Sequence, residues 1–399
     1  MKIDPYNHKK KYLSWKNSIK GRIPNLSEKN SRIVLDYIFD MEHGINVASG
    51  SRKGARGFPR LNNLRQRAIF LINQFEKRYG LIDVTKISER TLHEYFTGVR
   101  NGVITRLDGK PYMSPADYVK VFKAFWHWHQ KVNRKKGIEI QDITIDLDAS
   151  KDKPKWVYLT EEQIKKLMDN AKFDYKVLIM FLYDSGIRSP TELMNIRVSD
   201  FYNDFKELNI RDEISKTFGR RIKLMLSSEM IKDYILHKEL KTEDNLFTKE
   251  PATMNKYLRR LAMRILGDSV SPAGQRFSEL TMYDFRHCSC CYWLPRYKSE
   301  SALKFRFGWK KSDKIHYYSE MLGMRDTITD EDLLVDLTKT EIERQLVKSD
   351  KKNRILNDRV QVLEGQMKEI LRLTKRGEEL VVIDKNKPKI IRNLVTPLF

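Results

Sequence analysis

The sequence predicts a mainly α-helical protein with one small β-hairpin or sheet. Three observations carry this prediction. Apolar residues recur at helical spacing over most of the 399-residue chain, strand-like segments occur only in residues 207–226, and a heptad-like pattern follows residue 330. A chain of this length exceeds one ordinary hydrophobic core, so we expect two or three domains. The predicted order is a helical N-terminal part, a mainly helical domain that contains the hairpin, and a C-terminal coiled-coil helix.

Residues 1–48 are predicted to be an N-terminal helical extension with one clear amphipathic helix. Either Asn30 or Ser31 is expected to be the N-cap of this helix, because both side chains can accept a hydrogen bond from the first turn. The apolar face consists of Ile33, Val34, Tyr37, Ile38 and Met41.

Residues 49–148 are predicted to be a basic arm followed by a compact helical domain. The segment 49–60 holds three glycines, one proline and four cations, a composition that argues against a regular element. This segment is either a solvated loop or a flexible arm that contacts phosphates, and the charge of the whole chain favours the arm. Its cations are Arg52, Lys53, Arg56 and Arg60. Helical spacing follows from residue 61 to 136, and the last helix is expected to start with Ser114 as N-cap.

The clearest linker is the polar and charged segment 146–156, which Pro154 interrupts. A second, mainly helical domain is predicted for residues 157–325. Its first helix should begin with a capping box formed by Thr160 and Gln163. Residues 207–226 are expected to form two strands around a tight turn at Thr217–Gly219.

Residues 326–399 are predicted to form a C-terminal coiled coil and a short basic tail that begins near Glu378. The coiled coil rests on nine positions spaced alternately by four and three, seven of them apolar. A single amphipathic helix packed on the body of the protein is the alternative. The positions are Ile342, Leu346, Ser349, Asn353, Leu356, Val360, Leu363, Met367 and Ile370.

The charge of the chain predicts a polyanionic partner. Lys and Arg total 76 against 53 Asp and Glu, which gives a formal net charge of +23. The sequence contains no apolar run long enough to cross a bilayer and no apolar signal core, so we expect a cytoplasmic protein without a membrane segment. The three cysteines, Cys288, Cys290 and Cys291, lie within four residues and lack further ligands at zinc spacing, so we expect no metal site.

An ordered set of Arg, Lys, Arg and Tyr runs through the second domain and indicates phosphoryl transfer. Such chemistry without a metal needs an in-line nucleophile, cations for the equatorial oxygens and a proton donor for the leaving oxygen. Nothing in the sequence matches the P-loop pattern GxxxxGK[ST], and no spacing of carboxylates marks a metal-dependent nuclease.

The first motif is the segment 184–201, in which an apolar helix ends at Gly186 and Arg188 follows on a turn. Pro190 is expected to begin a new helix there. The segment resembles the first box of tyrosine recombinases, the phage-type integrase family, commonly written TGxRxxELxxLxxxDI. The spacing from Arg188 to Glu192 is one residue longer than in the common bacterial form, as in archaeal members.

Two further motifs resemble the same family. The hairpin places Lys216 where the family carries a lysine near its turn, which implies that Lys216 is the general acid for the leaving 5′ oxygen. Residues 280–294 resemble the HxxRH box, with Arg286 and His287 at its last two positions. Tyr283 stands where the family has its first histidine, similar to archaeal members; a phenol can donate a hydrogen bond to phosphate but cannot become a cation near neutral pH.

The fourth motif is the segment 307–321. The family places its nucleophilic tyrosine nine residues after a histidine or tryptophan, and Tyr318 lies nine residues after Trp309. Spacing therefore favours Tyr318 over the adjacent Tyr317. The resemblance also implies that Trp309 packs over the nucleophile and donates its indole N–H to the phosphate.

The resemblance covers roughly residues 50–325 and implies a site-specific recombinase that needs no cofactor. Its two domains would close around DNA as a clamp, with the linker along one groove. Arg188 and Arg286 would bind the scissile phosphate, and Tyr318 would form a 3′-phosphotyrosyl link. The family acts as a homotetramer on two double-stranded DNA attachment sites, so a nucleoid-associated location and a possible directionality factor are expected.

The biological role and two other functions remain open at this point. The extra terminal segments favour integration and excision of a mobile element over chromosome-dimer resolution by a host enzyme. A catalytically inactive architectural or regulatory DNA-binding protein with the same fold is the main alternative, because Tyr283 departs from the family pattern. A metal-dependent nuclease or transposase is the weakest alternative.

Overall fold

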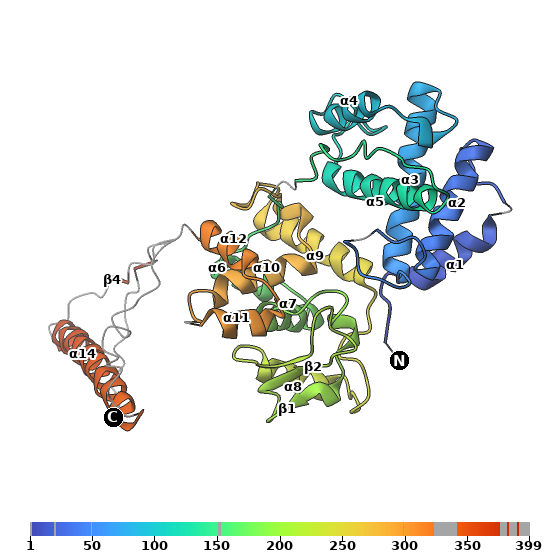
Figure 1. The fold of residues 1–399 in the computed structure, drawn as a ribbon. Helices are drawn as coiled ribbons and strands as arrows, with labels where there is room; N and C mark the ends of the chain where they lie inside the picture. The colour runs from blue at the N-terminus through green and yellow to red at the C-terminus, as the bar shows by residue number, and fades with distance from the viewer. Residues whose placement is uncertain are drawn as a thin grey trace. The chain divides into compact units, whose positions relative to one another are not determined.

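The computed structural model describes residues 2–19, 21–48, 50–150, 153–297, 299–322, 341–375, 381–382 and 389–390 (Figure 1). Residues 1–322 form one compact unit and residues 323–399 a second. The predicted fold class is confirmed, because the described chain is mainly helical with a small three-stranded sheet. Within the described ranges, no helix is both long and apolar enough to span a membrane.

In the N-terminal half of the first unit, every regular element among the described residues is a helix. Its elements are α1 (His8–Ser18), α2 (Glu28–His43), α3 (Phe58–Tyr79), the 3-10 helix η1 (Val84–Lys86), α4 (Glu89–Arg100) and α5 (Pro115–Arg134). A single hydrophobic cluster runs from Tyr12 to Leu147 through all of these α-helices. The segments 1–48 and 49–148, which are predicted from the sequence as separate parts, therefore share one hydrophobic core.

Helix α2 begins earlier than the sequence suggests. Ser27 is the N-cap, and its side chain accepts a hydrogen bond from the Asn30 amide at 3.3 Å. Asn30 and Ser31, the predicted caps, are buried inside the helix instead. The Asn30 side chain does not cap the helix, because it makes a tertiary contact instead. Its side-chain oxygen accepts a hydrogen bond from the backbone N–H of Val84 at 2.7 Å.

The basic segment 49–60 is irregular where it is described up to Gly57, after which α3 starts with Pro59 in its first turn. Ser114 is at the N-cap position of α5, as predicted, but its side chain makes no capping hydrogen bond. The capping box of Thr160 and Gln163 is confirmed at the start of α6.

The second half of the first unit consists of helices around one three-stranded sheet. The elements are α6 (Glu161–Asp169), α7 (Phe173–Ser185), η2 (Leu193–Asn195), η3 (Val198–Asp200), β1 (Phe201–Tyr202), β2 (Glu207–Ile210), β3 (Arg220–Lys223), α8 (Ser228–His237), α9 (Pro251–Leu266), η4 (Phe277–Glu279), α10 (Met282–Trp293), α11 (Glu300–Phe307) and α12 (Asp313–Met321). The sheet is antiparallel in the order β1-β2-β3, and Leu208 pairs with both Phe201 and Ile222.

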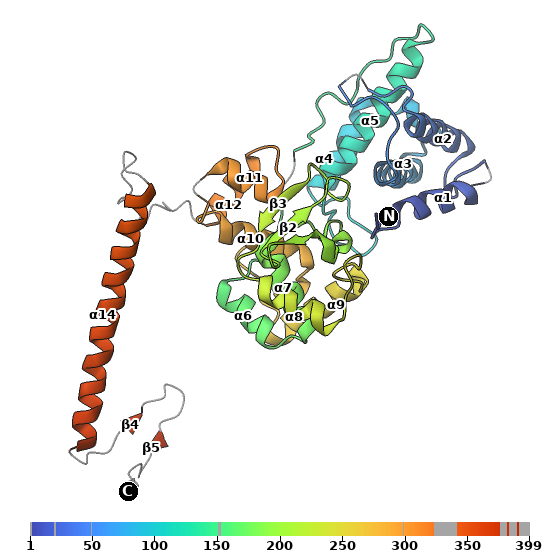
Figure 2. The same ribbon diagram turned by 90° about the horizontal axis from the view of Figure 1, so that it is seen from below.

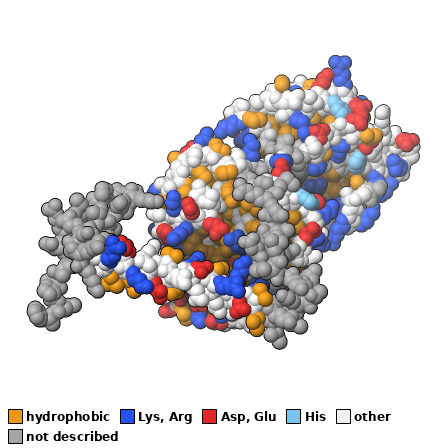
Figure 3. Space-filling model, turned by 90° about the vertical axis from the view of Figure 1, so that its left-hand side faces the viewer, with side chains coloured by type: hydrophobic (Ala, Val, Ile, Leu, Met, Phe, Trp, Pro, Cys, Tyr) orange, Lys and Arg blue, Asp and Glu red, His pale blue; other side chains and the backbone are white. Residues whose placement is uncertain are grey.

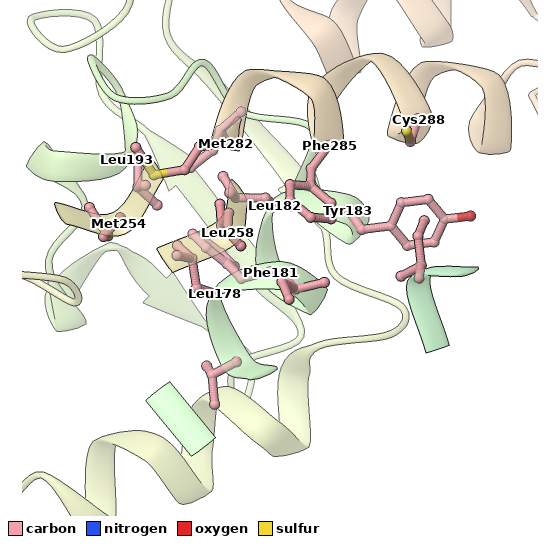
Figure 4. Packing of buried hydrophobic residues seen from close by; sticks show 14 of the residues in the cluster. Leu178, Phe181, Leu182, Tyr183, Leu193, Met254, Leu258, Met282, Phe285 and Cys288 are labelled. Carbon is pink, nitrogen blue, oxygen red and sulfur yellow. The ribbon is translucent and has the colours of Figure 1, made fainter. Parts of the chain in front are cut away.

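Helix α7 lies at the centre of this domain and packs against α10. Its sequence is apolar all round, and nine of its side chains are buried, which is the pattern of a core helix. Phe285 of α10 points toward Leu182 and Tyr183 of α7 (Figure 4). The cysteines of α10 are buried and form no disulfide, and they fill this core. No group of three or more metal-ligating side chains occurs in the described part of the chain.

Two local predictions in this domain are wrong. The hairpin has no tight turn at Thr217–Gly219, because nine residues, 211–219, connect β2 to β3. Its loop is closed by the Asp212 carboxylate, which accepts a hydrogen bond from the Gly219 amide at 2.6 Å. Likewise, Pro190 does not begin an α-helix: turns and the short η2 follow Arg188, because the Glu192 carboxylate accepts the Arg188 amide at 2.8 Å.

The second unit contains the helix α14 (Glu341–Lys375) and a two-stranded ladder of β4 (Val381–Val382) and β5 (Lys389–Ile390) (Figure 2). The predicted long helix is confirmed, whereas pairing into a coiled coil stays a prediction. Six of the seven apolar residues in the predicted heptad pattern are exposed: Leu346, Leu356, Val360, Leu363, Met367 and Ile370. Most of the predicted basic tail lies outside the described residues.

Candidate active site

Two helix C-termini form the floor of the site, and each ends in a left-handed glycine. Helix α7 ends at Gly186 with φ +59°, and α11 ends at Gly308 with φ +61°. A Cβ on Gly186 would lie 2.3 Å from the Phe307 ring, and one on Gly308 would lie 3.0 Å from the Arg220 guanidinium. Only glycine fits both the conformation and the space. The carbonyl groups at these helix ends are then free to accept hydrogen bonds from cations.

Arg286 binds both of these helix ends. This residue of α10 is 4% exposed, and its guanidinium donates to the carbonyls of Gly186 and, at 2.7 Å, of Phe307. It also lies over the Phe307 ring, 5.4 Å from the centroid. A cation is favourable at a helix C-terminus, so these two contacts fix Arg286 without a carboxylate.

Arg188 binds the end of α11 and a buried carboxylate. Its guanidinium donates to the Gly308 carbonyl at 2.7 Å and to Glu192 at 2.7 Å. A third contact, at 3.4 Å, reaches the Thr217 hydroxyl in the loop of the hairpin. The two arginines are therefore held by consecutive carbonyls, those of Phe307 and Gly308, and their charges are brought close together.

Glu192 supplies the negative charge that offsets the arginines of the site. Its carboxylate is fully buried and also accepts two hydrogen bonds from the buried Arg220, at 2.9 and 3.2 Å. Burial alone would raise the pKa of Glu192, but the hydrogen bonds and charges of Arg220 and Arg188 outweigh it and lower the pKa to about 2. The carboxylate therefore stays ionised and orients Arg188.

Tyr318 of α12 lies beside α10, in contact with the residue that follows Arg286. Its hydroxyl is 2.5 Å from Nδ1 of His287. Its ring stacks on Trp309 with centroids 5.8 Å apart and planes inclined by 9°, and Trp309 stacks in turn on Phe307. Tyr318 is 4% exposed, and this burial raises its pKa far above the usual range. The phenol is thus neutral at any ordinary pH in this state.

Of the residues that the sequence indicates, five are connected by these contacts: Arg188, Arg286, His287, Trp309 and Tyr318. Tyr283 is at the edge of the group, with its ring 5.2 Å from that of His287 and 44% of its surface exposed. Lys216 is exposed and makes no hydrogen bond or ion pair with a described residue. Its neighbour Thr217 brings the loop to the site, because the Thr217 hydroxyl donates to the Gly308 carbonyl at 2.8 Å.

The basic arm is a separate feature of the N-terminal helical domain. Arg52, Arg56 and Arg60 line a cavity of about 270 Å³ between α2, α3 and α5. None of the three has a carboxylate partner within the described ranges, although Arg56 donates to the Arg52 carbonyl at 2.6 Å. The cavity is also lined by Tyr37, whose buried hydroxyl has no partner among the described residues. Lys53 is exposed beside this cavity.

Cationic side chains are not confined to these two sites. On the face shown in Figure 3, Lys and Arg side chains are spread over the surface and interspersed with Asp and Glu.

Three side chains of the site were not recognised as functional from the sequence: Arg220, Thr217 and Trp156. Trp156 stacks on His287 with centroids 4.8 Å apart. Arg220 offered a weak signal, because it lies two residues before Ile222 and therefore on the same, buried face of its strand. Trp156 gave none, because its partners are more than 100 residues away.

Comparison with known proteins identifies the second domain. Residues 157–323 match the model of the phage integrase family. The fold is similar to that of the Tn1549 transposon integrase bound to transposon right end DNA, at 13% identity and a TM-score of 0.52, over 76% of this chain and 97% of that one. It is also similar to a lambda integrase tetramer bound to a Holliday junction, at 15% identity and a TM-score of 0.51, over 83% and 84% of the two chains.

A third similar structure is the XerH site-specific recombinase in a post-cleavage complex with palindromic difH substrate. It is 16% identical, with a TM-score of 0.50, over 66% of this chain and 77% of that one. No curated protein matches the sequence.

Proposed function

Because residues 157–323 match the phage integrase family, we propose that the chain is a tyrosine-type site-specific recombinase and that Tyr318 is the nucleophile that cleaves its DNA. One observation carries the proposal. The Tyr318 hydroxyl contacts His287, and the adjacent residue, Arg286, shares with Arg188 a pair of consecutive carbonyls. A phosphate bound by the two arginines would therefore lie near the phenol.

Arg188 and Arg286 would bind the non-bridging oxygens of the scissile phosphate. A guanidinium has five N–H donors, and the contacts described above use three of them on Arg188 and two on Arg286. The remaining donors can form charge-assisted hydrogen bonds with the phosphate, which strengthen as charge develops in the pentacoordinate transition state.

His287 would accept the proton of Tyr318 during attack. The burial that raises the pKa of Tyr318 makes the free phenolate inaccessible, so a base must act as the bond forms. Nδ1 of His287 is a basic group within hydrogen-bond distance of the hydroxyl. The oxygen of Tyr318 then bonds to phosphorus, the bond to the 5′ oxygen breaks, and a 3′-phosphotyrosyl link results.

Lys216 would protonate the leaving 5′ oxygen, and Tyr283 would donate a hydrogen bond to the phosphate. The Lys216 side chain is exposed in the loop between β2 and β3. The next residue, Thr217, holds this loop to the site through its hydrogen bond with Gly308. An exposed lysine can adjust to DNA that enters above the two arginines. Attack by the 5′ hydroxyl of a partner strand reverses the step, so the phosphodiester energy is conserved without ATP.

The arginines around the N-terminal cavity would bind the DNA backbone. Three cations without carboxylate partners in the described part of the chain surround this cavity, and the buried Tyr37 hydroxyl has no partner among the same residues. We assign Arg52, Arg56, Arg60 and the neighbouring Lys53 to phosphate contacts, which add affinity without reading sequence.

The assembly and role are proposed by analogy with the similar proteins. The lambda integrase structure is described as a tetramer on a Holliday junction, and the Tn1549 protein as a transposon integrase. We propose a homotetramer on two double-stranded attachment sites, in the nucleoid, that integrates and excises a mobile element, with a directionality factor as a further partner. Dimer resolution by a host enzyme and an inactive architectural protein are the alternatives.

The experiment that tests the chemistry uses a pool of random-sequence duplexes that carry a suicide nick, incubated with the protein and a metal chelator. Covalent complexes are isolated on a denaturing gel, and their DNA is sequenced and retested singly. Wild-type protein should form the adduct and Tyr318→Phe should not. Equal adduct formation by Tyr318→Phe would refute the assignment, and dependence on Mg²⁺ would point to a metal-dependent nuclease instead.

A further inference from the structure

The interdomain linker is attached to the helix that carries the nucleophile. The Tyr317 hydroxyl donates a hydrogen bond to the Pro154 carbonyl at 2.9 Å and accepts one from the indole N–H of Trp156 at 2.5 Å. One turn further along α12, the Glu320 carboxylate pairs with Lys153. Three of the four residues 153–156 therefore contact α12.

Trp156 also touches the proton acceptor that we assigned above. Its ring is 2% exposed and stacks on His287, and its edge faces the Tyr318 ring with centroids 6.3 Å apart. Its own position is fixed by the main chain, because the Trp156 amide donates to the Ala273 carbonyl at 3.3 Å and the Val157 amide to Asp284 at 3.0 Å. One side chain of the linker thus borders both Tyr317 and the His287–Tyr318 pair.

We propose that Tyr317 is a positioning residue, which clasps the linker to α12 and thereby fixes Tyr318 against His287 of the same chain. This inference rests on the proposed function and adds a second role to the tyrosine pair. Because successive residues of a helix differ by about 100° in direction, locking the Tyr317 phenol fixes the rotation of α12 and hence the direction of Tyr318. Helix α12 has nine residues, too few to be stable without such tertiary contacts.

The chemistry of the clasp explains why a tyrosine stands at position 317. An indole N–H can only donate and a proline offers only a carbonyl, so the group between them must both accept and donate. A phenol does both, whereas phenylalanine would leave the Trp156 N–H and the Pro154 carbonyl without this partner. A hydroxyl that donates its proton to one partner and accepts a hydrogen bond from another is a poor nucleophile. This difference favours Tyr318 over Tyr317 as the residue that attacks the phosphate.

A clasp between linker and nucleophile helix makes cleavage depend on the path of the linker. The linker joins the helical domain with the basic arm to the phage integrase domain, so its path changes with how the two domains hold DNA. A linker displaced from α12 would release the Tyr317 phenol and loosen Tyr318. Cleavage is therefore favoured when the linker lies on α12.

The first test is a double-mutant cycle with Tyr317→Phe and Trp156→Phe, which leave an aromatic ring at each position and remove the hydrogen bond between the two side chains. The single-turnover rate of adduct formation on the suicide duplex is measured at saturating protein, with the DNA affinity measured separately. Each single variant should slow the step about 3- to 10-fold, from the usual strength of such a bond. The double variant should be no slower than the slower single variant, and DNA affinity should stay within about twofold.

Tyr158→Phe is the matched control, because the Tyr158 ring packs against Trp156 but its hydroxyl has no hydrogen-bond partner within the described ranges. It should cleave at the wild-type rate. A wild-type rate in Tyr317→Phe would overturn the proposal. So would rate losses that multiply in the double variant, or a loss of affinity with an unchanged rate at saturation.

The second test does not depend on cleavage of DNA. Trypsin cuts after the exposed Lys155, and the appearance of this one fragment is followed by mass spectrometry in the full-length, DNA-free protein. The bond should be cut about 3- to 10-fold faster in Tyr317→Phe than in wild type or Tyr158→Phe, because opening of the linker sets the rate. Equal cutting rates would refute the clasp even if Tyr318 is the nucleophile, and faster cutting would support it even if wild type forms no adduct.

Discussion

At the scale of single residues, the site depends on cations held by backbone carbonyls rather than by carboxylates. Arg286 is fixed by the ends of α7 and α11, and Arg188 by the end of α11 together with Glu192. A carboxylate on each arginine would cancel the charge that a phosphate needs. Here one buried carboxylate, Glu192, is shared between Arg188 and Arg220, so the cluster keeps net positive charge.

Replacing His287 by asparagine should slow adduct formation by about 10²- to 10⁴-fold, because the phenol loses its proton acceptor. The pH profile should also change. Wild-type cleavage should fall in acid as the imidazole becomes protonated, and this fall should be absent from the residual activity of His287→Asn. His316 is an exposed histidine on α12, the helix that carries Tyr318, and His316→Asn is the control that should retain both rate and profile. An unchanged acid limb in His287→Asn would exclude His287 as the base.

Replacing Glu192 by glutamine should lower the free energy of unfolding by about 3–5 kcal/mol at neutral pH, because the buried Arg220 and the partly buried Arg188 lose their counter-charge. The pKa of Glu192 is lowered to about 2 from 4.5, so its contribution is complete above pH 4.5 and disappears as the pH falls toward 2. Urea titrations from pH 7 to pH 3 should therefore show wild type and Glu192→Gln converging in acid. A constant difference over this range would show that ionisation of Glu192 does not stabilise the fold.

At the scale of elements, the site is made by the ends of helices. Gly186 and Gly308 end α7 and α11 in left-handed conformations, and the loop 211–219 adds Thr217 from the hairpin. Helix α10 contributes Arg286 and His287 from adjacent positions, so this one helix fixes the arginine relative to the base, and the contact of Arg286 with the end of α7 places both.

Gly186→Ala should be more damaging than Gly80→Ala, although both glycines end a helix in the left-handed conformation. Gly80 has open space around its Cα, so the alanine there should cost only the conformational penalty of about 1–2 kcal/mol. At Gly186 the new Cβ would meet the Phe307 ring, which should add about 1–3 kcal/mol. Thermal unfolding of the two variants measures the difference in stability. Equal losses of stability would mean that the Phe307 ring moves aside at no cost in free energy.

Much of the element order was predictable, and the failures have physical causes. Helices with a clear apolar face, such as α3 and α5, were identified because burial follows local spacing. The cap of α2, the loop of the hairpin and the chain after Pro190 were not, because Asn30, Asp212 and Glu192 satisfy amides through contacts that spacing does not reveal. In the site, Arg188, Arg286 and Tyr318 were found through their motifs, whereas Arg220 and Trp156 act through tertiary contacts that no motif records.

At the scale of the whole molecule, the net charge of +23 predicts DNA binding that weakens steeply with salt. Replacing Arg52, Arg56 and Arg60 together by alanine should reduce the slope of log affinity against log salt by about 3, one for each lost phosphate contact. A control with equal loss of charge removes Arg32, Arg90 and Lys232, which pair with exposed carboxylates. Fluorescence titrations at several salt concentrations should separate the two, and equal slopes would show that the cavity contacts no phosphate.

The central claim is that Tyr318, and not its neighbour, forms the bond to DNA. The most direct measurement is to trap the adduct of the wild-type protein on a suicide duplex, digest both components and locate the attached nucleotide by tandem mass spectrometry. We predict a 3′-phosphoryl nucleotide on the Tyr318 hydroxyl. A nucleotide on Tyr317, or on any other residue, would contradict the account.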